Sequence, residues 1–292
     1  MFVKRDDLTP LAGGGNKIRK LGPICAAALA GGADVLVTGG GPQSNHVRAT
    51  AAAARHLGLD AVAVLTGEAP DRASGNLTVD ALLGVSFVWT GAASLVEVEI
   101  AIAEVTARLR DQGRRPYPIT VGGADPIGSQ GYVAAARELQ EQLPTVDLVV
   151  VADGSGGTHA GLSAGFGTHD RVLGVSVGAF DDIEARVERL AVATARSVDL
   201  PDPSGVPLVS ARFSPSGYGA EVDEAREAMH LAARTEGLIL DPVYTGKALA
   251  ALRAGLTDGT VGADRTIVFL HTGGAYGLLS ERYADWAAGP IV

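Results

Sequence analysis

The chain has 292 residues, of which 47% are hydrophobic and 20% are charged. This is enough to bury a large core, either in one α/β domain or in two lobes. The 24 basic and 33 acidic side chains give a net charge of −9, which argues against nucleic acid or an anionic membrane surface as a partner. The single cysteine, Cys25, cannot form an internal disulfide, which indicates a reducing compartment.

The first ten residues, MFVKRDDLTP, contain no apolar core of a signal peptide. The apolar segments along the chain are short and interrupted by Gly or Asp, unlike a membrane-spanning helix of about 20 residues. We therefore expect a cytoplasmic protein with no membrane partner.

In chain order, short β-branched runs are followed by glycine-rich turns and then by alanine-rich helical stretches. Strands are predicted within residues 34–41, 60–67, 85–91, 147–157, 171–178 and 265–274. Helices are predicted within residues 47–58, 94–113, 132–143, 180–198 and 220–237. Nearly continuous apolar strands alternating with helices predict an α/β fold with mostly parallel sheets, flanked by helices on both faces. The proline-rich stretch 199–207 predicts a surface loop.

Three of the predicted strands end in polar, glycine-rich turns, which read TGGGPQSNH, ADGSGGTHAG and LHTGGAYG. Ligands in parallel α/β folds bind at the carboxyl ends of strands, where glycine lets the backbone approach them. These three turns are therefore the places where a functional site is expected.

The turn DGSGGTHAGL follows a strong predicted strand and leads into a helical stretch. Its glycine and hydroxyl positions are Gly154, Ser155, Gly156, Gly157 and Thr158. Glycines that adopt positive φ expose successive N–H groups, and a helix N-terminus behind them favours an anion without a basic residue. The turn has neither the Gly-Lys-Ser/Thr ending of a P-loop nor the Gly-x-Gly-x-x-Gly pattern with its acidic ribose partner. It predicts a phosphate site, with a ligand-free glycine turn as an equal alternative on this motif alone.

Lys17 lies in the stretch GGGNKIRKL, directly after three glycines and an asparagine. A lysine in a first helical turn faces the positive end of the helix dipole, which disfavours its charged form. An amine that deprotonates easily and lies with a phosphate site suggests a Schiff-base lysine and pyridoxal phosphate. The alternative is an ordinary solvated lysine, which is the interpretation we give to Lys20.

The stretches VKRDDLTPLAGGGNKIRKL, GGGPQSNHVRATAAAARHLGL, DGSGGTHAGL, LDPVYTGKALAAL and FLHTGGAYGL resemble, in order, the motifs of one family. It is the D-cysteine desulfhydrase and 1-aminocyclopropane-1-carboxylate (ACC) deaminase family of fold type II, tryptophan-synthase-β-like pyridoxal-phosphate enzymes. The resemblance covers essentially the whole chain. It implies a homodimer with pyridoxal 5'-phosphate and a small amino-acid substrate between two lobes. Residues 1–18 plus 129–292 would form the large cofactor-binding lobe, and residues 19–128 the small lobe that binds the substrate carboxylate.

The resemblance also assigns roles on the cofactor. Lys17 would hold it as a Schiff base, and Asn45 would bond its phenolic oxygen. The phosphate would lie on Ser155, Gly156, Gly157 and Thr158. Tyr244 would stack on the pyridine ring, with a half-buried core tyrosine as the alternative. Thr272 would bond the pyridine nitrogen, and a neutral hydroxyl there makes the ring a weak electron sink that suits rapid loss of a β-leaving group.

Further roles concern the substrate. Lys17 would take and return the α-proton. Ser44, Asn45 and His46 would cradle the substrate carboxylate at a helix N-terminus, although Ser44 or Asn45 could equally cap that helix. Tyr218, a glycine-flanked loop tyrosine, would reach over the substrate. The residues implied to be catalytic are Lys17, Ser44, Tyr218 and Tyr244.

Two positions separate the branches of the family. Deaminase-type sequences carry Gln and Glu where this chain has His46 and Thr245, which is the desulfhydrase combination. The expected reaction is α,β-elimination from a D-amino acid with a β-leaving group, foremost D-cysteine to pyruvate, ammonia and sulfide. An ACC deaminase or a related lyase acting on a specialised amino acid is the second interpretation. A cofactor carrier or sensor without turnover and a nucleotide-binding domain are further alternatives.

Several other features have plainer expectations. The stretch 121–132 resembles a loop between the lobes, with Gly122, Gly123 and Gly128 as hinge positions. Residues 82–99 lie where side-chain selectivity could be set. The scattered histidines show no metal pattern, and His159 and His271 are expected to pack or to hydrogen-bond loops. Cys25 is expected to be a small core residue.

Overall fold

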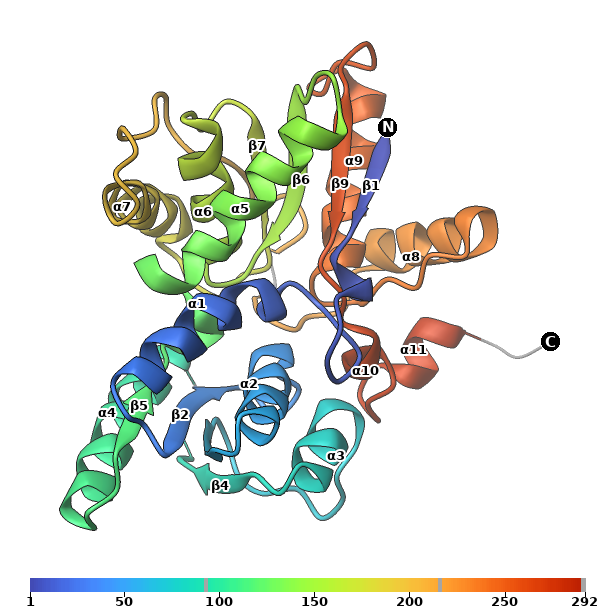
Figure 1. Cartoon of the computed structure of the whole chain (residues 1–292). Helices are drawn as coiled ribbons and strands as arrows, with labels where there is room; N and C mark the ends of the chain where they lie inside the picture. Colours follow the sequence, from blue (N-terminus) through green and yellow to red (C-terminus); the bar gives the residue numbers. More distant parts are fainter. Residues whose placement is uncertain (92–93, 215–216, 290–292) are drawn as a thin grey trace.

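The computed structural model describes residues 1–91, 94–214 and 217–289 (Figure 1). Within these residues the strands form two sheets, one of five strands in the order β1-β9-β6-β7-β8 and one of four in the order β4-β3-β2-β5. Every pairing of neighbouring strands in both sheets is parallel. The predicted α/β class with parallel sheets flanked by helices is confirmed. In Figure 1 the five-stranded large sheet lies above the four-stranded small sheet.

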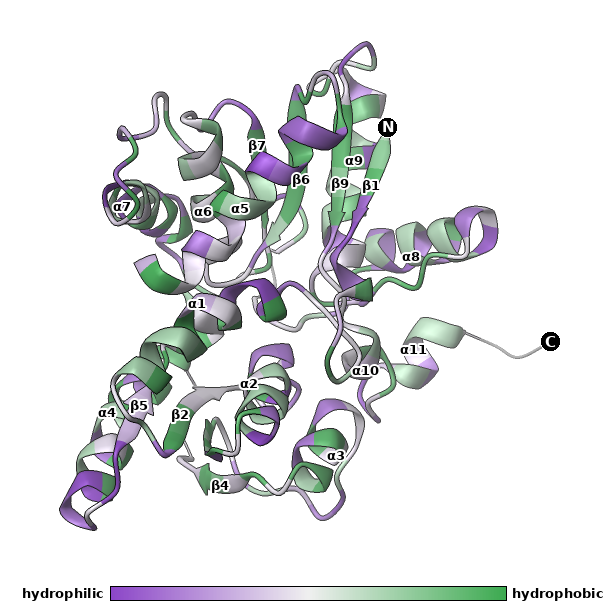
Figure 2. Cartoon of the chain, in the orientation of Figure 1, coloured by the Kyte–Doolittle hydropathy of each residue, from purple (hydrophilic) through white to green (hydrophobic). Residues whose placement is uncertain are grey.

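The large sheet is covered by helices on both faces. Its strands are β1 (Phe2–Arg5), β6 (Leu148–Asp153), β7 (Val172–Ser176), β8 (Leu208–Ser210) and β9 (Ile267–His271). Its helices are α5 (Pro126–Gln142), α6 (Gly157–Phe166), α7 (Ile183–Arg196), α8 (Asp223–Glu236) and α9 (Thr245–Asp258). Val149 and Val151 of β6 pack with α5 and α6, whereas Val150 between them packs with α8 and α9. Both faces of β6 are therefore apolar, as Figure 2 shows in green for β6 and β9.

The small sheet repeats this arrangement. Its strands are β2 (Val35–Gly40), β3 (Asp60–Leu65), β4 (Ser86–Trp89) and β5 (Pro116–Pro118). Its helices are α1 (Lys17–Ala30), α2 (Asn45–His56), α3 (Gly75–Leu82) and α4 (Leu95–Asp111). Leu36 of β2 packs in one cluster with α1 and α2, and its neighbours Val35 and Val37 pack in another with α4. The remaining short helices are η1 (Asp6–Leu8), η2 (Val121–Gly123), α10 (Ala275–Leu278) and α11 (Ala284–Ala288).

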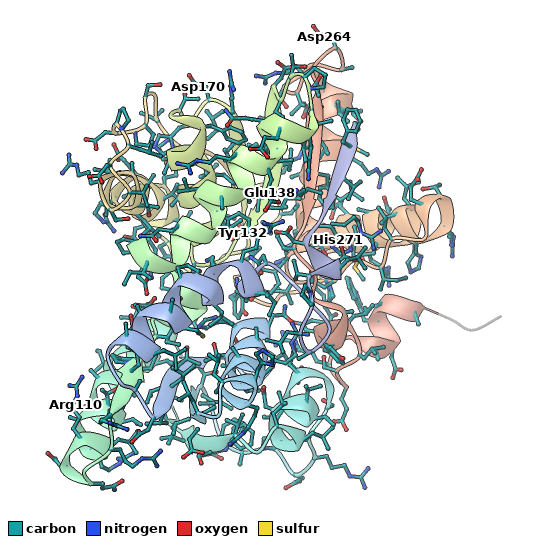
Figure 3. The ribbon with its side chains drawn as sticks, viewed as in Figure 1. Arg110, Tyr132, Glu138, Asp170, Asp264 and His271 are labelled. Atoms are coloured by element: carbon teal, nitrogen blue, oxygen red, sulfur yellow. The ribbon has the colours of Figure 1, made fainter. Side chains whose placement is uncertain are left out.

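A partly buried polar network holds α1 against η1 and α5, which belong to the large-sheet side. Arg19 of α1 donates to Asp6 at 2.9 Å and to both carboxylate oxygens of Glu138 at 2.8 and 2.9 Å. The Tyr132 hydroxyl donates to the other oxygen of Asp6 at 2.5 Å. Tyr132 and Glu138 both lie on α5, next to α1 in Figure 3. Because Arg19 follows Lys17 by two residues, this network also fixes the start of α1, where Lys17 lies.

The six predicted strands are confirmed, each within its expected range. The sequence patterns missed β1, β5, β8 and α3, which are short. The prediction of a loop over 121–132 is wrong in its second half, because α5 begins at Pro126 with Asp125 accepting a hydrogen bond from the Gly128 N–H at 2.7 Å. A Cβ at Gly128 would meet the Gly123 carbonyl at 2.4 Å, so Gly128 is a packed helix position and no loop hinge. The lobe boundaries at residues 18 and 128 stay a prediction. No described helix has the length and apolar character needed to cross a membrane.

Candidate active site

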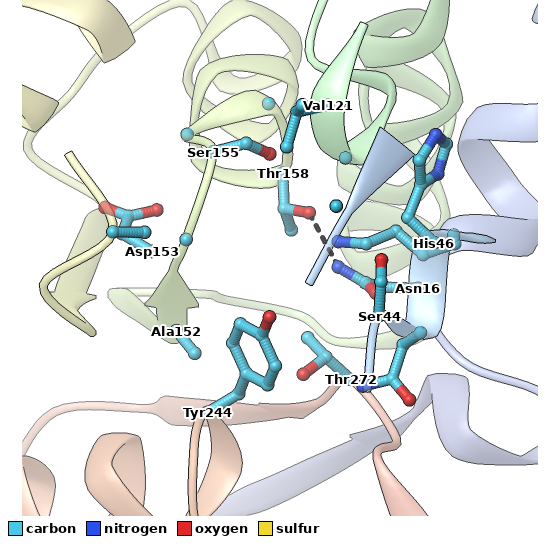
Figure 4. A pocket seen from close by; sticks show the side chains of 18 of the residues that line it. Asn16, Ser44, His46, Val121, Ala152, Asp153, Ser155, Thr158, Tyr244 and Thr272 are labelled. Carbon is cyan, nitrogen blue, oxygen red and sulfur yellow. Dashed lines mark hydrogen bonds between the residues drawn. The ribbon is translucent and has the colours of Figure 1, made fainter. Parts of the chain in front are cut away.

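A cavity lies where the carboxyl ends of β2, β6 and β9 meet (Figure 4). It brings together the residues that the sequence assigned to a site, which are Lys17, Ser44, Asn45, His46, Ser155, Gly156, Gly157, Thr158, Tyr218, Tyr244 and Thr272. They come from α1, α2, the β6–α6 turn, the loop before α8, the start of α9 and the end of β9. The three glycine-rich turns predicted to carry function thus face one space.

The β6–α6 turn is shaped to receive an anion. Gly156 has φ 81° and ψ −15°, a left-handed conformation that favours glycine. α6 then begins at Gly157, and the N–H groups of its first turn have no partner inside the helix. A Cβ at Gly157 would lie 2.6 Å from the Lys20 Nζ and 3.1 Å from the Ala124 Cα. Any residue other than glycine would therefore collide with these two neighbours. Free N–H groups at a helix start form an anion site.

Lys20 is a site residue that sequence reasoning missed. The expectation of a solvated lysine is wrong, because Lys20 is only 1% exposed and lines the cavity. Its Nζ donates to the Gly122 carbonyl at 3.0 Å. Burial, followed by the charge of Lys17, holds its pKa well below the ordinary lysine value. An anion beside Gly157 would supply the opposite charge. The one sequence signal is the spacing of three residues from Lys17, which places both on one helix face.

Lys17 is the first residue of α1 and its side chain lines the cavity. Its pKa is lowered from 10.5 to about 8, as the sequence predicted. The cause is removal of the ammonium from water by burial rather than the helix dipole that the sequence suggested. About one tenth of the amine is therefore neutral at pH 7 and can accept a proton, far more than for an ordinary lysine.

The QSNH turn caps α2 and lines the cavity. Ser44 caps α2, because its Oγ accepts a hydrogen bond from the Val47 N–H at 3.3 Å. The Asn45 Oδ1 accepts from Asn76 at 3.0 Å, which fixes the orientation of the Asn45 amide at the cavity wall. His46 is 1% exposed, and neither ring nitrogen has a hydrogen-bond partner among the described residues. Burial and then the positive charges of Lys17 and Lys20 lower the pKa of His46 well below its ordinary value, so the ring is neutral.

Two tyrosines meet across the cavity. The Tyr218 and Tyr244 hydroxyl oxygens are 2.6 Å apart, and the rings are T-shaped with centroids 6.2 Å apart. Burial raises the pKa of both phenols, so both are protonated at neutral pH. A Cβ at Gly154 would lie 3.2 Å from the Tyr244 ring, so this glycine makes room for it. Tyr244 also packs on the core of the large sheet, so the alternative of a half-buried core tyrosine holds alongside its place in the cavity.

Of the two threonines that bear on the family branch, Thr272 lines the cavity and Thr245 does not. Thr272 lines the cavity, and its backbone carbonyl accepts from the Asn16 N–H at 3.0 Å. Thr245 is fully buried, and its hydroxyl donates to the Asp241 carboxylate at 2.6 Å. Thr245 is therefore held on Asp241, and it does not belong to the cavity lining given by the described residues.

The expectations for His159, His271 and Cys25 are confirmed. His159 Nδ1 lies 2.7 Å from Asp153 Oδ2, and His271 Nδ1 accepts from the Gly273 N–H at 3.3 Å, so both histidines hydrogen-bond near loops. Cys25 is buried in the core beside the small sheet. Within residues 1–91, 94–214 and 217–289, no group of three or more His, Cys, Asp or Glu side chains could hold a metal ion.

Comparison with known proteins gives the same cofactor. Residues 1–273 match the model of a family described as pyridoxal-phosphate dependent enzyme. The crystal structure of an ACC deaminase homologue is 38% identical, with a TM-score of 0.91, over 98% of this chain and 87% of that one. Threonine deaminase isoform 2 from Solanum lycopersicum is 18% identical, with a TM-score of 0.65, over 93% of this chain and 78% of that one. An L-serine ammonia-lyase from Rhizomucor miehei is 20% identical, with a TM-score of 0.67, over 98% of this chain and 91% of that one. The last two show the fold alone.

Proposed function

This chain belongs to the pyridoxal-phosphate-dependent enzymes, in the branch of ACC deaminase and D-cysteine desulfhydrase, and we propose that it is a lyase for D-amino acids with a β-leaving group. D-cysteine is the foremost candidate substrate, with pyruvate, ammonia and sulfide as products. We further propose that the cofactor lies in the cavity described above.

The residues present fit this cofactor. The N–H groups at the start of α6, together with the Ser155 and Thr158 hydroxyls, would hold the phosphate. The bound phosphate would favour the protonated form of the buried Lys20 amine, which would then neutralise it. Asn45 would bind the phenolic oxygen, Tyr244 would face the ring, and the Thr272 hydroxyl would meet the pyridine nitrogen. When bound, pyridoxal phosphate supplies an electron sink for the charge that develops at the substrate α-carbon.

The protein's own groups would move the protons. The α-proton would pass to the Lys17 Nζ, whose pKa of about 8 makes it a competent base. As the carbon–sulfur bond breaks, the sulfur keeps the electron pair and needs a proton. Tyr218 and Tyr244 have two O–H protons, and their mutual hydrogen bond uses only one of them. The other O–H is free to donate to the leaving sulfur. Ser44 and the N–H groups at the start of α2 would hold the substrate carboxylate.

One observation carries the choice of elimination over ring opening. Thr245 occupies the position where deaminase-type sequences have Glu, and its hydroxyl is held by Asp241. The polar group left for the pyridine nitrogen is the neutral Thr272 hydroxyl, which keeps that nitrogen unprotonated and the electron sink weak. A weak sink suits a substrate whose leaving group departs soon after the α-proton is removed.

Similarity to an ACC deaminase homologue keeps ring opening as the second candidate function. Release of 2-oxo acid from D-cysteine, L-cysteine and ACC by the cofactor-loaded protein separates the two. We expect release from D-cysteine alone. Release from ACC with none from D-cysteine would replace the proposed function by the second candidate, and release from none of the three would reject both.

A further inference from the structure

Arg186 on α7 contacts both a helix that packs on the small sheet and the turn after β6 of the large sheet. Its Nη2 donates to the Glu99 carboxylate at 3.1 Å, and its Nε donates to the Ser155 carbonyl at 3.2 Å. Its guanidinium also lies over the Phe180 ring, 4.2 Å from the centroid. Glu99 lies on α4, which packs against the small sheet, whereas α7 packs on α5 and α6 of the large sheet. One side chain therefore joins a helix of the small sheet to the phosphate-binding turn.

The contact with the Ser155 carbonyl bears on the orientation of the next N–H group, that of Gly156. In a trans peptide the carbonyl of one residue and the N–H of the next point in opposite directions. The described residues include no cis peptide bond, so this holds for the Ser155–Gly156 peptide. Arg186 is not among the described residues that line the cavity, so its bond draws the Ser155 carbonyl toward α7, which would leave the Gly156 N–H on the cavity side. Gly156 lines the cavity, where an anion would accept that N–H.

The contact with Glu99 positions α4, which contributes Leu95 to the wall of the cavity opposite the phosphate-binding turn. Glu99 follows Leu95 by four residues on α4, so the two share a helix face. Leu95 of α4 and Phe180, in the connection between β7 and α7, both line the cavity. The Arg186–Glu99 ion pair therefore fixes α4 against α7, and with it the separation of these two apolar side chains. Glu99 and Arg186 are 30% and 21% exposed, so solvent screens the pair only in part.

We propose that Arg186 is a positioning residue with two separable effects. Its bond to the Ser155 carbonyl sets the affinity for pyridoxal phosphate, because it orients the turn that receives the phosphate. Its bond to Glu99 sets the substrate KM, because it holds the two walls of the cavity together. The KM effect rests on the proposed lyase function, whereas the cofactor effect rests only on the family.

The experiment compares Arg186→Gln, Glu99→Gln and the double variant, with Arg189→Gln as the matched control. Arg189 lies on the same helix and pairs with Asp182 at the surface, 2.9 Å away, so its loss removes an arginine without touching the cavity. Titration with pyridoxal phosphate should show a Kd about ten-fold higher for Arg186→Gln, the loss of one charge-assisted hydrogen bond. Glu99→Gln and Arg189→Gln should leave that Kd unchanged.

With D-cysteine, Glu99→Gln should raise KM about three-fold without lowering kcat. The double variant should be no worse in KM than Arg186→Gln alone, because either change removes the same ion pair. Hydrogen exchange of the α4 amides should accelerate equally in Glu99→Gln and Arg186→Gln, and not in Arg189→Gln. Arg186→Lys keeps the charge but cannot fork between two acceptors, so it should recover only one of the two effects.

A cofactor Kd for Arg186→Gln equal to that of Arg189→Gln would overturn the first effect. Multiplicative KM effects in the double variant, or unchanged exchange of α4 in both single variants, would overturn the second. If the wild-type protein does not turn over D-cysteine, the proposed function fails. The cofactor titration and the hydrogen exchange then still decide whether Arg186 acts as we propose.

Discussion

The hydroxyl oxygens of Tyr218 and Tyr244 lie 2.6 Å apart, although 26 residues separate them in the sequence. Burial raises the pKa of both phenols. The pair therefore stays protonated over the range in which Lys17 titrates, so one cavity holds a base and an acid at the same pH. This is the arrangement that an elimination requires, since one proton is removed as another is delivered.

We assign the proton for the leaving sulfur to Tyr218, the tyrosine expected to reach over the substrate, so Tyr218→Phe should lower kcat for D-cysteine about 10²-fold. Its pyridoxal phosphate Kd should stay unchanged, since Tyr218 does not belong to the phosphate-binding turn. The control is Tyr117→Phe, because Tyr117 lies on β5 of the small sheet and outside the cavity lining given by the described residues. An unchanged kcat in Tyr218→Phe would exclude this tyrosine as the acid.

Lys20→Met should raise the Kd for pyridoxal phosphate about ten-fold, because the buried amine beside Gly157 would no longer neutralise the phosphate. Fluorescence titration of the cofactor-free protein measures this directly. Lys247→Met is the matched control, since Lys247 is also fully buried but lies on α9 outside the cavity lining. Equal Kd values for the two variants would remove Lys20 from the phosphate site.

The pH dependence of cofactor loading follows from the lowered pKa of Lys17. Only the neutral amine attacks an aldehyde. The rate at which the cofactor-free protein captures pyridoxal phosphate should rise about ten-fold per pH unit below pH 8 and level off above it. A rate that continued to rise toward pH 10.5 would show a lysine with an ordinary pKa.

The lowered pKa of Lys17 also makes the stability of the cofactor-free fold depend on pH. Because the unfolded chain binds this proton more tightly, Lys17 destabilises the cofactor-free fold increasingly as pH falls from 10.5 to 8.

Thr245→Glu should not create an ACC deaminase. The new carboxylate would lie beside Asp241 in a fully buried position, so we expect a destabilisation of about 3 kcal/mol and no gain in ring opening. Thr245→Ser keeps the hydroxyl and should retain most of the stability. Thermal unfolding and 2-oxo acid release from ACC test both points, and robust ring opening by Thr245→Glu would show that this one position decides the branch.

Much of the fold could be predicted because the long strands are buried on both faces and so are continuously apolar, as in β6. The missed strands have other patterns. β1 reads FVKR at a sheet edge, and β5 reads PYP, whose prolines disfavour a strand prediction. The glycines of residues 121–132 suggest a flexible loop. Gly128 instead lies in α5, where glycine is required by the close approach of the Gly123 carbonyl.

The cavity residues that lie in glycine-rich turns could also be predicted, since strand ends converge in a parallel sheet. Lys20 and Arg186 could not. A charged residue on a helix is ordinarily solvated, whereas Lys20 is buried and its Nζ donates to the Gly122 carbonyl, 102 residues away in the sequence. The partner of Arg186 is 87 residues away on another helix. Such contacts depend on how the two sheets come together, which local patterns do not record.

The most direct test of the central claim is pyruvate release from D-cysteine by Lys17→Ala, with its pyridoxal phosphate content measured in the same sample. The account predicts a loss of about 10³-fold or more in turnover, while the phosphate-binding turn and Lys20 retain much of the cofactor affinity. Release at the wild-type rate by this variant would contradict the assignment of Lys17 as the base, and with it the proposed mechanism.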